Sequence, residues 1–142
     1  MTAIHRSALV ARPAGRLYAL VNDVESYPRR FAWCDAARVL EQAPDLQVAR
    51  LTVRAGAVTT TFTTRNRLEP GRRIGLELVD GPFKRLQGQW SFIALSAGAC
   101  KVTLDLEFEM AGMLDPVLAV GFRGLADRMV DDFCRAARGD DD

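Results

Sequence analysis

The sequence has little of what catalytic and metal sites usually need. Histidine occurs once, as His5. A serine–histidine–aspartate triad would have to use it, and we expect instead an exposed or hydrogen-bonded strand histidine. Cys34, Cys100 and Cys134 are odd in number, lie far apart and form no Cys-x-x-Cys pair. This pattern argues against a disulfide framework and a zinc site, and it favours a reducing compartment. No base lies near Cys34 in the sequence, so we expect a packed thiol rather than a nucleophile.

Long apolar runs and phosphate-binding loops are also missing. No window approaches the ~20 apolar residues of a transmembrane helix. The first fifteen residues, MTAIHRSALVARPAG, contain no continuous apolar segment of a signal peptide. GAVTTTF and GPFKRLQG lack the spacing and the strand-to-helix context of a phosphate loop. We therefore expect a cytoplasmic bacterial protein without a cofactor, with peripheral contact at the inner face of the membrane as an alternative.

Charge is nearly balanced. The formal net charge is +1, and Lys84 and Lys101 are the only lysines, so arginine supplies almost all the positive charge. With this balance, the net charge gives no reason to expect binding to nucleic acid, to a membrane or to acidic ligands. We expect no DNA partner. A local arginine patch is still compatible with it.

The chain is long enough for one ordinary domain. It has 142 residues, of which 49% are hydrophobic and 26% charged, a composition typical of globular proteins that bury a core without disulfides. We expect a single domain over residues 1–138. Residues 139–142 have like charges and a terminal position, which predict a disordered acidic tail.

Alternating side chains predict a series of strands. The clearest is the segment from Cys100 to Met110, whose even-numbered residues are all apolar. Its odd-numbered residues, which include the acidic Asp105, Glu107 and Glu109, are polar and belong to the opposite, solvated face. The other predicted strands are Ala3–Ala11, Arg38–Glu41, Leu46–Val53, Val58–Leu68, Ile74–Leu78 and Leu86–Phe92. QAPD, EPGR and DGP supply turn signals between them.

Two segments predict helices. Leu17, Leu20, Val21 and Val24 have helical spacing after Pro13, which indicates a helix from Pro13 to about Asn22. After Gly112 the period changes, and an apolar stripe predicts a second helix from about Met113 to Arg138. The residues of that stripe are Leu114, Leu118, Gly121, Leu125, Met129 and Phe133.

These elements predict an α+β fold in which a curved antiparallel sheet of six to seven strands surrounds the long C-terminal helix. Each strand and the helix have one apolar face to bury, so the sheet must curl around the helix. Such an arrangement leaves space between the two, where small apolar ligands bind.

An aromatic segment connects the first helix to the second strand. Pro28 interrupts any continuous helix, so Tyr27–Phe31 is at most a short helix. Tyr27, Phe31 and Trp33 are expected to cover one end of the space between sheet and helix, either as a lid or as a cap on the core. Arg29 and Arg30 would then face water, lipid headgroups or RNA.

The strand Val58–Leu68 separates two kinds of side chain. Arg65 and Arg67 lie on its outer face, and with Arg29 and Arg30 they form a candidate contact for RNA or an anionic membrane. A solubilising surface is the alternative. Thr60, Thr64 and Asn66 lie on the inward face, where buried polar groups need partners and could orient a ligand with a polar head.

Four segments resemble the coenzyme Q-binding, START-like family of the polyketide cyclase/dehydrase-like superfamily: LVNDVESYPRRFAWC, TFTTRNRLEP, LVDGPFKRLQGQWSF and KVTLDLEFEM. The resemblance runs from about Ile4 to Ala137. It implies a helix-grip fold with a lipophilic cavity and no catalysis. One departure is RAGAV, Arg54–Val58, where relatives often carry an aromatic residue and a lysine.

The resemblance implies three hypotheses for function. The first is non-enzymatic binding of ubiquinone or a related polyprenyl lipid in support of respiratory electron transport. The second is a ribosome association inhibitor, the toxin of a toxin–antitoxin pair, that binds the large ribosomal subunit. The third is a cyclase or dehydrase-like enzyme, which would need a polar group such as Asn66 or Asp80 in the cavity. The residues expected to line or border the cavity are Tyr27, Phe31, Trp33, Phe62, Leu78, Trp90, Phe92, Leu104, Leu106, Leu118, Phe122, Leu125 and Met129.

Overall fold

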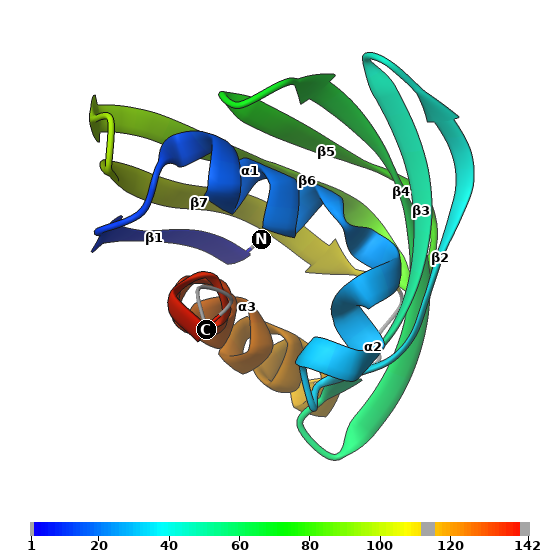
Figure 1. Ribbon diagram of the computed structural model, residues 1–142. Coiled ribbons are helices and arrows are strands. Elements are labelled where there is room, and N and C mark those ends of the chain that lie inside the picture. Colours follow the sequence, from blue (N-terminus) through cyan, green and yellow to red (C-terminus); the bar gives the residue numbers. More distant parts are fainter. Residues whose placement is uncertain (1, 112–115, 140–142) are drawn as a thin grey trace.

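The computed structural model describes residues 2–111 and 116–139, and its centre is one antiparallel sheet of seven strands (Figure 1). The strand order is β1-β7-β6-β5-β4-β3-β2, so only β1 and β7 are neighbours without being consecutive. The strands are β1 Thr2–Val10, β2 Cys34–Ala43, β3 Leu46–Ala55, β4 Val58–Glu69, β5 Arg73–Asp80, β6 Phe83–Ser96 and β7 Ala99–Met110.

The helices lie on the concave side of this sheet (Figure 1). The long helix α3, Pro116–Gly139, packs against β1 on one side and β3 on the other. Between β1 and β2 the chain forms α1, Ala14–Asn22, a 3-10 turn η1, Val24–Ser26, and the short helix α2, Tyr27–Arg30. The fold is therefore the α+β helix grip that the sequence predicts.

The core lies between the sheet and α3. The inward side chains of β7, Cys100, Val102, Leu104, Leu106 and Phe108, are all buried, as are Leu125, Val130 and Phe133 of α3. The alternation of β7 and the stripe of α3 are thus confirmed, because each element has a single buried face.

Several boundaries differ from the sequence prediction; β6, for example, extends over Phe83–Ser96 rather than Leu86–Phe92. The strand β2 extends from Cys34 to Ala43, beyond the predicted Arg38–Glu41, because irregularities at Cys34/Ala36 and Val39/Glu41 break its alternation. Pro13 precedes α1 in an extended conformation rather than forming its first turn. The predicted helix start at Met113, with Leu114 of the stripe, lies outside the described residues.

The C-terminal end of the predicted domain, residue 138, lies within α3. Gly139 is the last residue of α3, and the rest of the predicted acidic tail, residues 140–142, lies outside the described residues. Among the helices that the structure describes, none is long and apolar enough to cross a membrane.

Candidate functional site

A small cavity lies between the concave face of the sheet and α3. Its volume is about 80 Å³, enough for two or three waters, since each occupies about 30 Å³ in the liquid. Ligand pockets for drug-sized molecules are usually about 300–1,000 Å³. Its lining residues are Val21, Val24, Tyr27, Gln47, Ala49, Leu51, Phe62, Thr64, Asn66, Ile74, Leu76, Leu86, Trp90, Leu104, Leu106, Phe122, Met129 and Phe133.

Polar side chains form one wall of this cavity. The register of β3 and β4 places Gln47 opposite Asn66. The Asn66 amide nitrogen donates to Gln47 Oε1 at 2.9 Å, and the Thr64 hydroxyl donates to Asn66 Oδ1 at 2.7 Å. Gln47 in turn donates to the carbonyl of Asn22 at 3.0 Å. All three side chains are buried, so the network satisfies polar groups that would otherwise destabilise the core.

The structure brings seven of the thirteen predicted cavity residues to the cavity wall: Tyr27, Phe62, Trp90, Leu104, Leu106, Phe122 and Met129. Phe92, Leu118 and Leu125 are buried core residues that do not line it, and Leu78 is half-buried on β5. Phe31 and Trp33 do not line the cavity either; they line a separate surface hollow. Ligand contact by any of these residues stays a prediction.

Sequence reasoning missed Gln47, the residue that holds the polar wall together. Its signal was available: once Gly56 and Ala57 are taken as the turn between β3 and β4, counting back along both strands pairs Gln47 with Asn66. Gly56 has φ +67°, which suits such a turn.

The predicted aromatic segment closes the end of the grip. Phe31 stacks on Trp33 with ring centroids 4.9 Å apart, and Phe133 of α3 meets Phe31 at 4.7 Å and Tyr27 at 5.2 Å. Tyr27 and Phe133 line the cavity, whereas Phe31 and Trp33 line a separate surface hollow. The cluster is therefore a wall between the two, and each of its rings is buried.

The predicted arginine contact is divided between two places. Arg29 and Arg30 belong to α2, and Arg65 and Arg67 lie on the outer face of β4. The outer-face hollow that Arg65 and Arg67 line also contains Glu77, Asp105 and Glu107. Arg30 lines a different hollow, whose lining residues include neither Arg65 nor Arg67.

The titratable groups of the core favour neutral forms. Burial raises the pKa of Cys34 and of Cys134 to about 11, and it also raises the pKa of Tyr27, whose hydroxyl donates to the Val21 carbonyl. Thiols with such pKa values are protonated near neutral pH and are poor nucleophiles.

Of His5, Asp80 and Asn66, the polar groups considered for catalysis from the sequence, only Asn66 lines the cavity. His5 is exposed and hydrogen-bonded to Asp105 on the outer face, and Asp80 is exposed at the end of β5. Asn66 does line the cavity, but within the polar network. In residues 2–111 and 116–139, no group of three or more His, Cys, Asp or Glu side chains could hold a metal ion.

Comparisons with known proteins agree with this geometry. Residues 10–134 match the family described as polyketide cyclase / dehydrase and lipid transport. The ribosome association toxin RatA of Pseudomonas aeruginosa is 48% identical over 138 residues, which cover 96% of each chain. RatA of Escherichia coli K12 is 43% identical over 140 residues, which cover 97% of this chain and 88% of that protein.

A solved structure shows the same fold at lower identity. The Zhui aromatase/cyclase from Streptomyces sp. R1128 superposes with a TM-score of 0.83 over 96% of this chain and 93% of that one, at 23% identity. The match over 10–134, together with the RatA relatives, shows that the chain belongs to the polyketide cyclase / dehydrase and lipid transport family.

Proposed function

We propose that this protein is a ribosome-associated factor that binds the large ribosomal subunit and interferes with subunit association. The observation that carries the proposal is the 48% identity to a ribosome association toxin along 96% of both chains. The similarity extends over nearly the whole chain and is not confined to a short motif.

The chemistry of the cavity supports a role in binding rather than catalysis. Among the described residues that line it there is no carboxylate, histidine, lysine, arginine or cysteine. Tyr27, the one ionisable group in this part of the lining that the structure describes, is buried and hydrogen-bonded to the backbone, and burial raises its pKa. A cyclase or dehydrase needs an acid or base with a pKa suited to proton transfer, and this lining supplies none.

Co-sedimentation with purified bacterial ribosomal subunits tests the proposal. We expect the protein to sediment with the large subunit and to lower the yield of joined ribosomes when the two subunits are mixed. Binding should weaken as KCl is raised, because contacts with rRNA release counterions. An absence of sedimentation with the large subunit at low salt would contradict the proposal.

A second candidate function is binding of a hydrophobic molecule with a polar head, such as ubiquinone. The specific observation in its favour is the buried Gln47–Asn66–Thr64 network on an otherwise apolar wall. A cavity of about 80 Å³ is too small for a quinone ring with its chain, so binding would require α3 or the aromatic cluster to move.

Native mass spectrometry of the protein purified from its own host tests this second candidate. A co-purifying lipid or quinone that is lost in an Asn66→Leu variant would support it. If the protein carries no ligand and addition of a short-chain ubiquinone does not change its melting temperature, the cavity serves only packing.

A further inference from the structure

A second concave site opens where α2, the end of β3 and the C-terminal half of α3 meet. We call it the arginine hollow, and its volume is about 620 Å³. Its lining residues are Arg30, Phe31, Ala32, Trp33, Arg54, Gly56, Arg128, Asp132, Arg135 and Ala136. Four arginines and one carboxylate thus share this surface, in a chain whose formal net charge is only +1.

Among the described lining residues, Asp132 is the single carboxylate, and its charge is already compensated. Trp33 Nε1 donates to Asp132 Oδ2 at 2.9 Å, and Arg135 Nη1 contacts Asp132 Oδ1 at 2.9 Å. Both oxygens of Asp132 are therefore engaged, and its side chain is only 20% exposed. The other three arginines determine how the surface attracts an anion.

Those three arginines come from three different elements. Arg54, at the end of β3, is 61% exposed, and its Nε forms an ion pair with Asp35 Oδ1 at 2.9 Å. Arg30 of α2 donates from Nε to the Ser26 hydroxyl at 3.2 Å. Arg128 of α3 is exposed and has no hydrogen-bond or ion-pair partner among the described residues. Guanidinium groups that are already held by such contacts lose less conformational entropy when they bind an anion.

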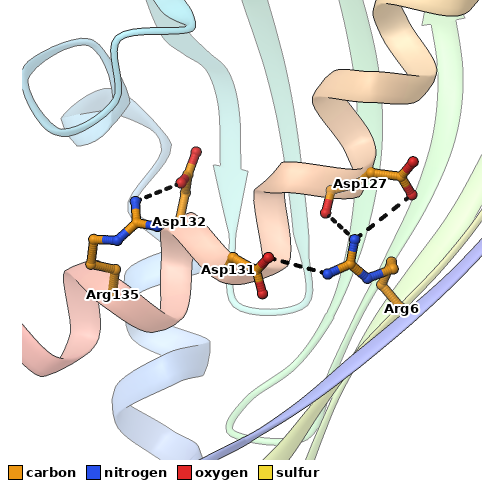
Figure 2. Close-up of polar contacts among 5 residues, drawn as sticks. All are labelled: Arg6, Asp127, Asp131, Asp132 and Arg135. Atoms are coloured by element: carbon orange, nitrogen blue, oxygen red, sulfur yellow. Dashed lines mark hydrogen bonds and ion pairs between the residues drawn. The ribbon is translucent and has the colours of Figure 1, made fainter.

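Two of the three acidic residues of α3, Asp127 and Asp131, do not line the hollow. Figure 2 shows Asp127 and Asp131 directed toward Arg6 of β1, whereas Asp132 turns to Arg135. Arg6 donates to the Asp127 carbonyl oxygen at 2.5 Å and to Asp131 Oδ2 at 3.2 Å. The helix therefore has an acidic side, occupied by β1, and a basic side, open to solvent.

From this arrangement we infer that the arginine hollow is the surface that binds the phosphate backbone of RNA, an inference that rests on the proposed association with the ribosome. Planar guanidinium groups match phosphate oxygens in pairs. Phe31 and Trp33 form the floor but are both 6% exposed, so bases cannot stack on them, and recognition falls to the backbone phosphates.

The residues that line the hollow favour RNA over a membrane surface as its partner. Peripheral membrane binding combines basic side chains with apolar ones that enter the bilayer. The large hydrophobic side chains that the described residues expose are Leu9, Leu40, Val79, Ile93, Leu95, Val117 and Val120. None of them lines the hollow.

The test compares two double variants that remove equal charge. In Arg54→Gln/Arg128→Gln the hollow loses two arginines, and in Arg65→Gln/Arg67→Gln the outer face of β4 loses two. Affinity is measured over a KCl series for purified bacterial large ribosomal subunits, for protein-free large-subunit rRNA and for phosphatidylglycerol vesicles. Arg128→Gln alone, at an exposed residue without a described partner, is included in case the hollow variant folds poorly.

We expect the hollow variant to bind both RNA-containing probes about tenfold more weakly at low salt, with a salt dependence shallower by about two counterions. Arg128→Gln alone should show about half of that change in salt dependence. The affinity of the outer-face variant should stay within about twofold of that of the wild type. This pattern, together with unchanged vesicle binding, supports the inference.

Other outcomes separate the inference from the proposed function. If the wild type binds subunits and every hollow variant binds as tightly, the inference fails and ribosome association stands. If the wild type binds subunits but not stripped rRNA, the hollow contacts ribosomal protein, and the RNA assignment is wrong. Vesicle binding lost only in the hollow variant would assign the site to membrane. If the wild type binds no subunits, both proposals fail.

Discussion

The indole nitrogen of Trp33 lies 2.9 Å from the Asp132 carboxylate, although the two residues are 99 positions apart in the sequence. This hydrogen bond ties the segment between α2 and β2 to the C-terminal half of α3. Because Trp33 also stacks on Phe31, the contact fixes the outer layer of the aromatic cluster against the helix.

Trp33→Phe should therefore destabilise the fold while keeping an aromatic ring in place. A hydrogen bond to a charged group stabilises by about 1.5–3 kcal/mol, and we expect a loss of about this size in the free energy of unfolding. Urea denaturation measures it. Phe31→Leu, which leaves the Trp33–Asp132 bond intact, is the comparison. A Trp33→Phe variant as stable as the wild type would show that the bond contributes nothing.

Gly121 and Gly124 of α3 should respond in opposite directions to alanine. A Cβ on Gly121 would lie 2.2 Å from the Ala55 carbonyl oxygen, so α3 touches the end of β3 there backbone to backbone. A Cβ on Gly124 meets nothing within 4 Å. We expect Gly121→Ala to cost about 2–3 kcal/mol through overpacking and Gly124→Ala to stabilise by up to about 1 kcal/mol through helix propensity.

Chemical denaturation of the two variants side by side checks this prediction. Equal effects would show that the contact between α3 and Ala55 relaxes at little cost. Gly121 provides close packing with the sheet, since neither glycine lines the cavity.

Elements with one buried face could be predicted from the sequence. The strand β7 and the helix α3 each bury a single face, so the period of the apolar residues gives the element directly. The strand β2 is mostly exposed and irregular at two places, so its pattern has no clean period. A bulge moves every later side chain to the other face, and pattern analysis cannot follow it.

The candidate sites were harder to predict because they are assembled from distant segments. Gln47 could be paired with Asn66 by counting from the turn at Gly56, which is local information. The arginine hollow has no such local signal. Arg30, Arg54 and Arg128 come from three elements, and only the packing of α2 and β3 on α3 brings them together.

The polar wall of the cavity should be sensitive to the loss of any member. Asn66→Ala removes the donor to Gln47 and the acceptor from Thr64. Each buried polar group left without a partner costs about 1–3 kcal/mol, so we expect a loss of at least about 2 kcal/mol.

Thr52→Ala is the matched control for Asn66→Ala. The Thr52 hydroxyl is 2.9 Å from that of Thr61 on the exposed face of the same strand pair, where water replaces a lost partner. Its effect should be within about 0.5 kcal/mol. Thermal unfolding of both variants measures the difference. Similar melting temperatures would show that water enters the cavity and satisfies Gln47 and Thr64.

The buried thiols should make the fold weaker in alkali. Burial raises the pKa of Cys34 and Cys134 from 9.0 to about 11. Between about pH 9 and 11 the folded state therefore holds protons that the unfolded state has lost, so the free energy of unfolding falls as pH rises through this window. The loss is up to about 2.7 kcal/mol per thiol, since each pKa unit corresponds to about 1.36 kcal/mol. Urea unfolding across this range should show a shallower decline for Cys34→Ala/Cys134→Ala than for the wild type, with part of the decline retained because burial also raises the pKa of Tyr27. Parallel curves for the two proteins would mean that the thiols ionise alike in both states.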